Sequence, residues 1–147
     1  MKILKVRDVK TPNRGTSESA GIDLFVPNDF DTVLLGPNES ILIPSGIKAN
    51  VPEGHALIAF NKSGIAVKKK MLVGACVIDE DYQGEIHIDL KNVGSEAVGI
   101  EPGDKIIQLL CIPVNYVPVE EVESEDELFS GLVTDRGAGG FGSTGEK

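Results

Sequence analysis

The residues best suited to chemistry lie near the C-terminus, in a glycine-rich segment from Arg136 to Gly145. Its glycines permit backbone angles and close approaches that other residues avoid, and successive peptide N–H groups can form a nest that binds an anion. Arg136 adds a planar cation suited to phosphate oxygens, Phe141 a flat apolar face, and Ser143 and Thr144 two hydroxyl donors. This set indicates a lid over a nucleotide, although a disordered tail has a similar composition.

A second segment, Ile78-Asp79-Glu80-Asp81-Tyr82-Gln83-Gly84-Glu85, places acids and a tyrosine between two apolar runs. Aspartate and glycine are favoured in turns, so the segment fits an acidic hairpin turn. It also fits a carboxylate base beside a ring that shapes a pocket. The segment alone leaves both interpretations open.

Three further segments carry weaker signals. Asn61-Lys62-Ser63-Gly64-Ile65-Ala66 resembles part of a phosphate-binding turn but lacks the spacing of a P-loop. Asp23, in Ala20–Leu24, and Gln108, in Gly103–Leu109, would each alone be read as a polar group at a turn or a strand edge.

Composition limits the partners of these residues. A chain of 147 residues suits one domain, and its net charge of −9 disfavours a nucleic-acid partner but not a small anion in a basic pocket. Cys76 and Cys111 lie in apolar runs without metal-binding spacing, which predicts small buried side chains in a reducing compartment. No apolar run suits a signal peptide or a membrane span, so we expect a cytoplasmic protein with no membrane partner.

The sequence predicts short strands almost throughout, separated by turns rich in glycine and proline, which is typical of an all-β sandwich or barrel. Within one of them Ile86, Ile88 and Leu90 should face the core. The expected strands are Lys2–Val9, Ile22–Val26, Ser40–Pro44, Gly46–Val51, His55–Phe60, Ile86–Asn92 and Lys105–Val114.

Helical signals are sparse. Ser63–Met71 suits a short helical turn with Ser63 as its cap. Glu120–Glu127 is acidic and poor in apolar residues, so we expect an exposed connection to the glycine-rich segment.

Five of these segments occur once each and in a fixed order. In this respect the chain resembles the trimeric dUTPase family (deoxyuridine triphosphate nucleotidohydrolases) over nearly its whole length. The family's motifs match Ala20–Leu24, Asn61–Ala66, Gly74–Gly84, Gly103–Leu109 and Arg136–Gly145.

The resemblance implies an all-β distorted barrel with jelly-roll character. It implies a homotrimer in which each C-terminal arm crosses to a neighbouring subunit and closes over its site. On this basis residues 1–129 should form the barrel domain, and residues 130–147 a flexible glycine-rich arm of the same domain.

The activity implied is hydrolysis of dUTP to dUMP and pyrophosphate, which limits uracil in DNA and supplies dUMP for dTMP synthesis. Asp79 would be the general base that directs a water in line at the α-phosphorus. Mg²⁺ would be the cofactor, held by the triphosphate and water and by no protein ligand.

The resemblance also assigns the substrate-binding residues. Tyr82 would exclude a 2′-hydroxyl, the hairpin around Val73–Ile78 would read uracil, Phe141 would stack on it, and Asp23 would organise its neighbours without touching substrate. The full set expected to bind substrate is Lys62, Ser63, Gly64, Val73, Gly74, Val77, Ile78, Tyr82, Gln108, Arg136, Phe141, Gly142, Ser143 and Thr144.

Three positions depart from the family pattern. Lys62 stands where many members have arginine, so it keeps the charge and lacks the bidentate fork. Cys76 replaces a common glycine, and Val73 replaces a side-chain amide found in some members, so uracil recognition would rest on the backbone.

Two alternatives to dUTP hydrolysis are a dCTP deaminase of the same fold and a regulatory nucleotide-binding trimer without turnover.

Overall fold

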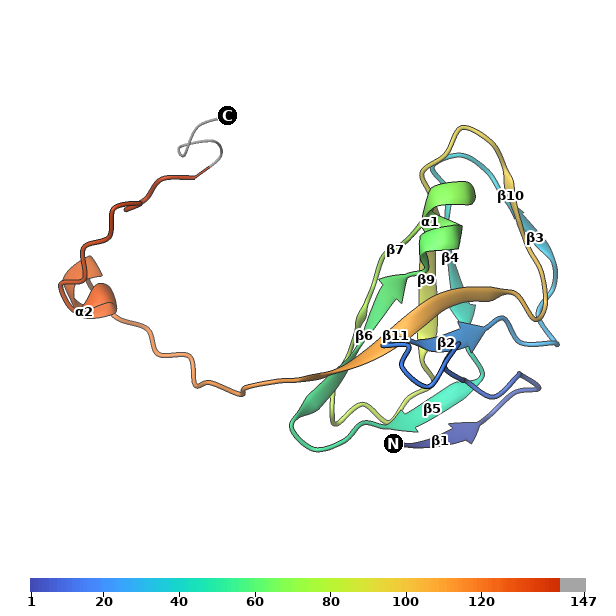
Figure 1. Ribbon diagram of the computed structural model, residues 1–147, viewed down its shortest axis with the longest axis horizontal. Coiled ribbons are helices and arrows are strands. Elements are labelled where there is room, and N and C mark those ends of the chain that lie inside the picture. Colours follow the sequence, from blue (N-terminus) through green and yellow to red (C-terminus); the bar gives the residue numbers. More distant parts are fainter. Residues whose placement is uncertain (141–147) are drawn as a thin grey trace. The chain divides into compact units, whose positions relative to one another are not determined.

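The computed structural model describes residues 1–140, which fall into two compact units, one from Met1 to Asn115 and one that begins at Tyr116 (Figure 1). Short antiparallel strands make up most of the first unit. Its elements are β1 (Lys2–Lys5), β2 (Ile22–Phe25), β3 (Val33–Leu35), β4 (Ser40–Pro44), β5 (Ile47–Asn50), β6 (His55–Asn61), α1 (Ser63–Lys68), β7 (Met71–Val73), β8 (Val77–Ile78), β9 (His87–Asn92), β10 (Val98–Ile100) and β11 (Lys105–Pro113).

The strands form four small antiparallel sheets. The largest has the order β2-β11-β6-β8, and β4-β9-β7 forms a second. The pairs β1-β5 and β3-β10 complete the set. In the largest sheet Gln108 is paired with Asp23 on one side and with Phe60 on the other. This register brings segments far apart in the sequence to neighbouring positions.

Aliphatic side chains make up most of the core, with Phe25 among them. Ile86, Ile88 and Leu90 are buried, while His87 and Lys91 on the other face of β9 are exposed. This confirms the alternation predicted for the strand. Burial of such chains is the main force that holds the sheets together, at about 25 cal/mol per Å² of apolar surface.

All seven strands expected from the sequence are present, most of them with shorter bounds. Four others, β3, β7, β8 and β10, were not predicted because runs of two or three residues are too short for an alternating pattern. Cys76 and Cys111 are both free and half-buried against the core.

The helical turn after β6 differs in one detail from the prediction. The α1 helix begins at Ser63, so its cap is Lys62, whose backbone is extended and whose side chain makes no capping hydrogen bond. Ser63 as the cap was therefore wrong by one residue. The Lys62 side chain is engaged elsewhere, with Asp23.

The second unit contains a short helix, α2 (Glu125–Phe129), which overlaps the end of the segment expected to be an exposed connection and has no buried residue. Ser124 caps it by accepting a hydrogen bond from Glu127 N at 3.2 Å. Three acidic residues in the first turn suit the positive end of the helix dipole. A boundary after residue 129 stays a prediction. No helix in residues 1–140 is long and apolar enough to cross a membrane.

Candidate active site

The candidate active site is a depression of about 200 Å³ in the first unit. It combines the acid and the tyrosine singled out in the sequence, Asp79 and Tyr82, with the loop between β7 and β8. Its lining residues are Leu42, Ala75, Cys76, Val77, Ile78, Asp79, Tyr82, Ile86 and His87.

Asp79 directly follows β8, which pairs with β6 through Ile78 and Leu57. The Asp79 side chain is exposed, so solvent and ligands can reach its carboxylate. Tyr82 N donates to Asp79 O at 3.2 Å, which closes a turn that places the acid and the tyrosine side by side. A polar turn after β8 thus places an exposed carboxylate in the lining of the depression.

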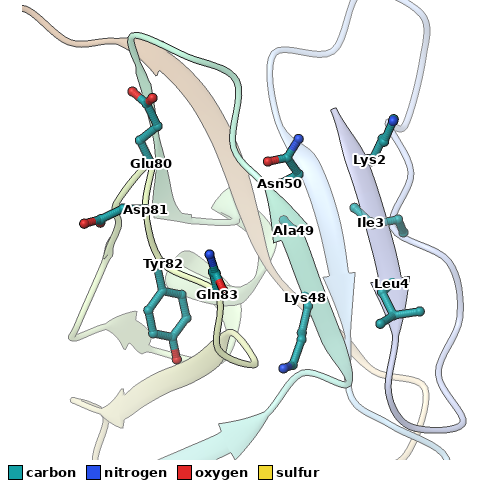
Figure 2. A pocket seen from close by; sticks show the side chains of 10 residues that line it. All are labelled: Lys2, Ile3, Leu4, Lys48, Ala49, Asn50, Glu80, Asp81, Tyr82 and Gln83. Carbon is teal, nitrogen blue, oxygen red and sulfur yellow. The ribbon is translucent and has the colours of Figure 1, made fainter.

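The Tyr82 ring is held at its far end, because its hydroxyl donates to Glu85 O at 2.8 Å. The ring also borders a second depression of about 370 Å³, between the loop that joins β8 to β9 and the β1-β5 pair. Figure 2 shows Tyr82 and Gln83 on that loop, across from Lys48 and Asn50 of β5. Tyr82 therefore separates two hollows, and only the one described above is lined by Asp79.

Glu85 anchors the end of this loop. Its Oε1 accepts from Arg7 Nε at 2.9 Å and from Gly46 N at 2.7 Å. Burial would raise the pKa of the Glu85 carboxyl, but these hydrogen bonds and the Arg7 charge hold its pKa below the usual value. Glu85 is thus ionised at neutral pH and holds the carbonyl that fixes Tyr82.

The second group of expected site residues lies around the end of β6. Gln108 Nε2 donates to Asn61 O at 3.0 Å. A Cβ at residue 21 would overlap the Gln108 side chain, so glycine is required there for Gln108 to lie across β2. Ser63 and Gly64, in the first turn of α1, are exposed. Gln108, Ser63 and Gly64 are absent from the lining of the Asp79 depression.

Asp23, which is opposite Gln108 in the sheet, is buried and pairs with two lysines. Lys62 Nζ donates to Asp23 Oδ1, and Lys105 Nζ lies 3.0 Å from Oδ2. Burial would raise the pKa of the Asp23 carboxyl, but the hydrogen bonds and charges of the two ammonium groups together hold its pKa below the usual value. The buried Asp23 carboxylate therefore holds the ammonium groups of Lys62 and Lys105 in place.

Arg136 lies in the second unit, where its Nε donates to Gly139 O at 2.9 Å. Gly139 N donates back to Arg136 O at 2.9 Å, which closes a tight turn. Phe141, Gly142, Ser143 and Thr144, also expected to bind substrate, lie outside the described residues.

Sequence reasoning missed the residues that support the site. Asn61 Oδ1 accepts from Val73 N at 2.7 Å, and Asp89 Oδ2 accepts from Ala75 N at 3.0 Å. Asn61 stands inside a quoted motif, and Asp89 stands on the polar face of a predicted strand. In both cases the sequence shows only that the residue is polar, because the peptide N–H group that it binds is more than ten residues away along the chain.

Comparison with known proteins identifies the family. A family model described as dUTPase matches residues 7–145. The chain belongs to the dUTPase family. It is 41% identical to a deoxyuridine 5′-triphosphate nucleotidohydrolase of Hydrogenobaculum over the whole of both chains. It is also 41% identical to the mouse enzyme of that name, over 92% of this chain and 78% of the mouse protein.

Solved structures agree on the fold. The dUTPase of Staphylococcus bacteriophage 80alpha with dUPNHPP superimposes with a TM-score of 0.85, at 24% identity, over 98% of this chain and 97% of the phage chain. The chain is thus a dUTPase, an enzyme of nucleotide metabolism, built from several antiparallel sheets. This confirms the family, the enzyme class and the β-rich fold expected from the sequence.

Proposed function

We propose that this dUTPase converts dUTP to dUMP and pyrophosphate, with Asp79 as the base that directs a water in line at the α-phosphorus. The observation that carries the proposal is the exposed Asp79 carboxylate in the lining of a depression, fixed beside Tyr82 by a turn. A positioned carboxylate can orient a water and accept its proton. The rest of the rate enhancement in such a reaction comes from positioning and charge stabilisation.

The uracil ring of the substrate would be recognised by peptide groups of the Val73–Ile78 hairpin. Gly74, Val77 and Ile78 would be among the residues that bind it. Four of the depression's lining residues belong to this hairpin: Ala75, Cys76, Val77 and Ile78. Peptide groups of fixed orientation discriminate strongly, because a wrong base leaves buried polar groups unpaired. Tyr82 would crowd a 2′-hydroxyl, since its ring is held at the hydroxyl end.

The phosphates would be held by Ser63, Gly64, Gln108 and Lys62, and by Arg136 with Gly142, Ser143 and Thr144 of the arm, while Phe141 would stack on uracil. The Lys62 ammonium donates a hydrogen bond to Asp23. Asp23 would therefore set the position from which this positive charge meets the triphosphate. Arginine in that place would offer two parallel donors, whereas lysine acts as a point charge.

The complete site would combine three copies of the chain, with each arm crossing to a neighbour. The residues expected around the phosphates are absent from the lining of the Asp79 depression, which suits a site assembled from different subunits. The protein would then be a homotrimer with a distorted jelly-roll barrel in each subunit.

Mg²⁺ suits this donor set as a partner of the substrate. In residues 1–140 no three histidine, cysteine, aspartate or glutamate side chains gather into a metal-binding group. A hard cation that brings phosphate and water oxygens as ligands fits such a surface. When bound, it would neutralise the charge of the phosphate oxygens.

In the cell this reaction would limit uracil in DNA and supply dUMP for dTMP synthesis. A cytoplasmic location and the absence of nucleic-acid and membrane partners stay predictions from the sequence.

The test is product analysis of purified protein with Mg²⁺ and each of dUTP, dCTP, dTTP and UTP, with Asp79→Asn as control. The proposal predicts dUMP and pyrophosphate from dUTP alone, and their loss in the variant. Ammonia released from dCTP would instead indicate a deaminase. Tight dUTP binding without turnover would indicate a regulatory protein.

A further inference from the structure

The segment proposed to recognise uracil is held by main-chain hydrogen bonds at four successive residues, from Val73 to Cys76. Val73 N donates to Asn61 Oδ1 at 2.7 Å, and Cys76 O accepts from Ala59 N at 2.7 Å. Between them, Gly74 N donates to the Asp89 main-chain oxygen at 3.0 Å and Ala75 N donates to Asp89 Oδ2 at 3.0 Å. Asp89 thus supplies two of these four bonds, one of them through its side chain.

The position of Asp89 explains how it reaches the loop. It lies in the middle of β9, opposite Leu42 of β4, and β7 pairs along the other edge of the strand. Its side chain is half-buried and projects from the polar face that it shares with His87 and Lys91. A hydrogen bond from a peptide N–H to a carboxylate is stronger than one between neutral groups.

Gly74 makes this contact possible and also makes it necessary. A Cβ at residue 74 would overlap Asp89 Oδ2, so only glycine lets the carboxylate approach Ala75 N. Glycine also has access to many backbone conformations, so the peptide group between Gly74 and Ala75 could rotate easily if nothing held it. The Asp89 carboxylate is the side chain that holds the N–H of this peptide group.

We propose that Asp89 is a positioning residue that sets the base specificity of this dUTPase. The proposal rests on the function proposed above, in which the hairpin reads the base. Because a peptide group is planar, anchoring Ala75 N–H also fixes the direction of the Gly74 carbonyl. Uracil and cytosine present opposite donor and acceptor patterns at N3 and at the exocyclic position, so rotation of a single peptide group would weaken the preference for uracil.

The test compares kcat and KM for dUTP and dCTP in the full-length protein and in Asp89→Ala. We expect KM for dUTP to rise about tenfold, which corresponds to about 1.4 kcal/mol, with little change in kcat. The ratio of kcat/KM for dUTP to that for dCTP should fall by a similar factor. Asp89→Asn, which keeps an acceptor oxygen, should retain most of the discrimination.

Lys91→Ala is the matched control, since Lys91 lies on the same face of β9 and is exposed. Asp89→Ser provides the same comparison if the alanine variant does not fold. A merely structural role would lower the melting temperature or the active fraction for both nucleotides and leave their ratio unchanged. An unchanged ratio in a folded Asp89→Ala or Asp89→Ser variant would overturn the proposal, whereas absence of dUTP turnover in the unaltered protein would overturn the proposed function itself.

Discussion

The proposed chemistry depends on Asp79, whose side chain is exposed. Asp79→Asn keeps the shape and removes the base, so kcat for dUTP should fall by about 10²- to 10⁴-fold. The affinity for dUTP should change little, because the proposed role of Asp79 is to direct a water and asparagine has nearly the same size and shape. Calorimetric titration with dUTP and a pyrophosphate-release assay measure the two quantities. Loss of binding together with turnover would contradict the role as base.

Tyr82 is the residue expected to reject a ribonucleotide, and its ring is fixed through Glu85 O. Tyr82→Ala removes the ring, so the preference for dUTP over UTP should fall by about tenfold or more. The kcat/KM ratio for the two nucleotides measures the effect, and Tyr116→Ala, in the second unit, is a control of the same residue type. Unchanged discrimination would exclude Tyr82 as the gate.

Asp23 links stability to pH through its pairing with Lys62 and Lys105. Its pKa is lower in the folded state than the ordinary value of 3.8. Its contribution to the free energy of unfolding is therefore present above this value, and it is lost as pH falls through the lowered folded-state pKa. Wild type should lose more stability than Asp23→Asn between neutral pH and about pH 3. Urea unfolding at several pH values checks this, and equal losses would contradict the account.

Among the elements, β9 joins the core to the site, with buried aliphatic chains on one face and Asp89 on the other. Ile88→Ala removes a side chain that is 1% exposed, and should lower the free energy of unfolding by about 2–5 kcal/mol. Lys91→Ala, on the exposed face, should change it by about 0.5 kcal/mol or less. Chemical denaturation compares the two, and similar losses would mean that β9 is not a core strand.

The predictability of the elements follows their length and the range of their contacts. β9 and β11 are long enough to show their pattern, whereas the two residues of β8 show none. The α2 helix has a capping signal in Ser124 and Glu127 that the overall acidity of the segment obscured. Asp79 and Tyr82 are close in sequence, so their proximity could be predicted. The pairing of Asp23 with Lys105 joins residues 82 positions apart (105 − 23) and depends on β2-β11 register.

For the whole molecule, the arm is expected to complete a site in another copy of the chain. Deletion of Arg136–Lys147 should leave the folded first unit intact, because its core lies within residues 1–115. It should abolish dUTP hydrolysis, as the phosphate contacts proposed for the arm would be lost. Circular dichroism and light scattering check the fold and the number of subunits. Hydrolysis at the full rate would exclude the arm as a lid.

Mixed assemblies separate a shared site from one built within a single chain. Asp79→Asn and the truncated protein should each be inactive alone. Refolded together, they should regain activity if Asp79 and the arm come from different subunits, because some sites then contain both intact parts. Absence of recovery, in mixtures shown by mass spectrometry to contain both chains, would contradict the exchange of arms.

The central claim is that a water directed by Asp79 attacks the α-phosphorus of dUTP. Hydrolysis of dUTP with Mg²⁺ in ¹⁸O-labelled water, followed by mass spectrometry of both products, tests it most directly. The account predicts one labelled oxygen in dUMP and none in pyrophosphate. Label in pyrophosphate, with unlabelled dUMP, would place the attack on the β-phosphorus and contradict the proposed geometry.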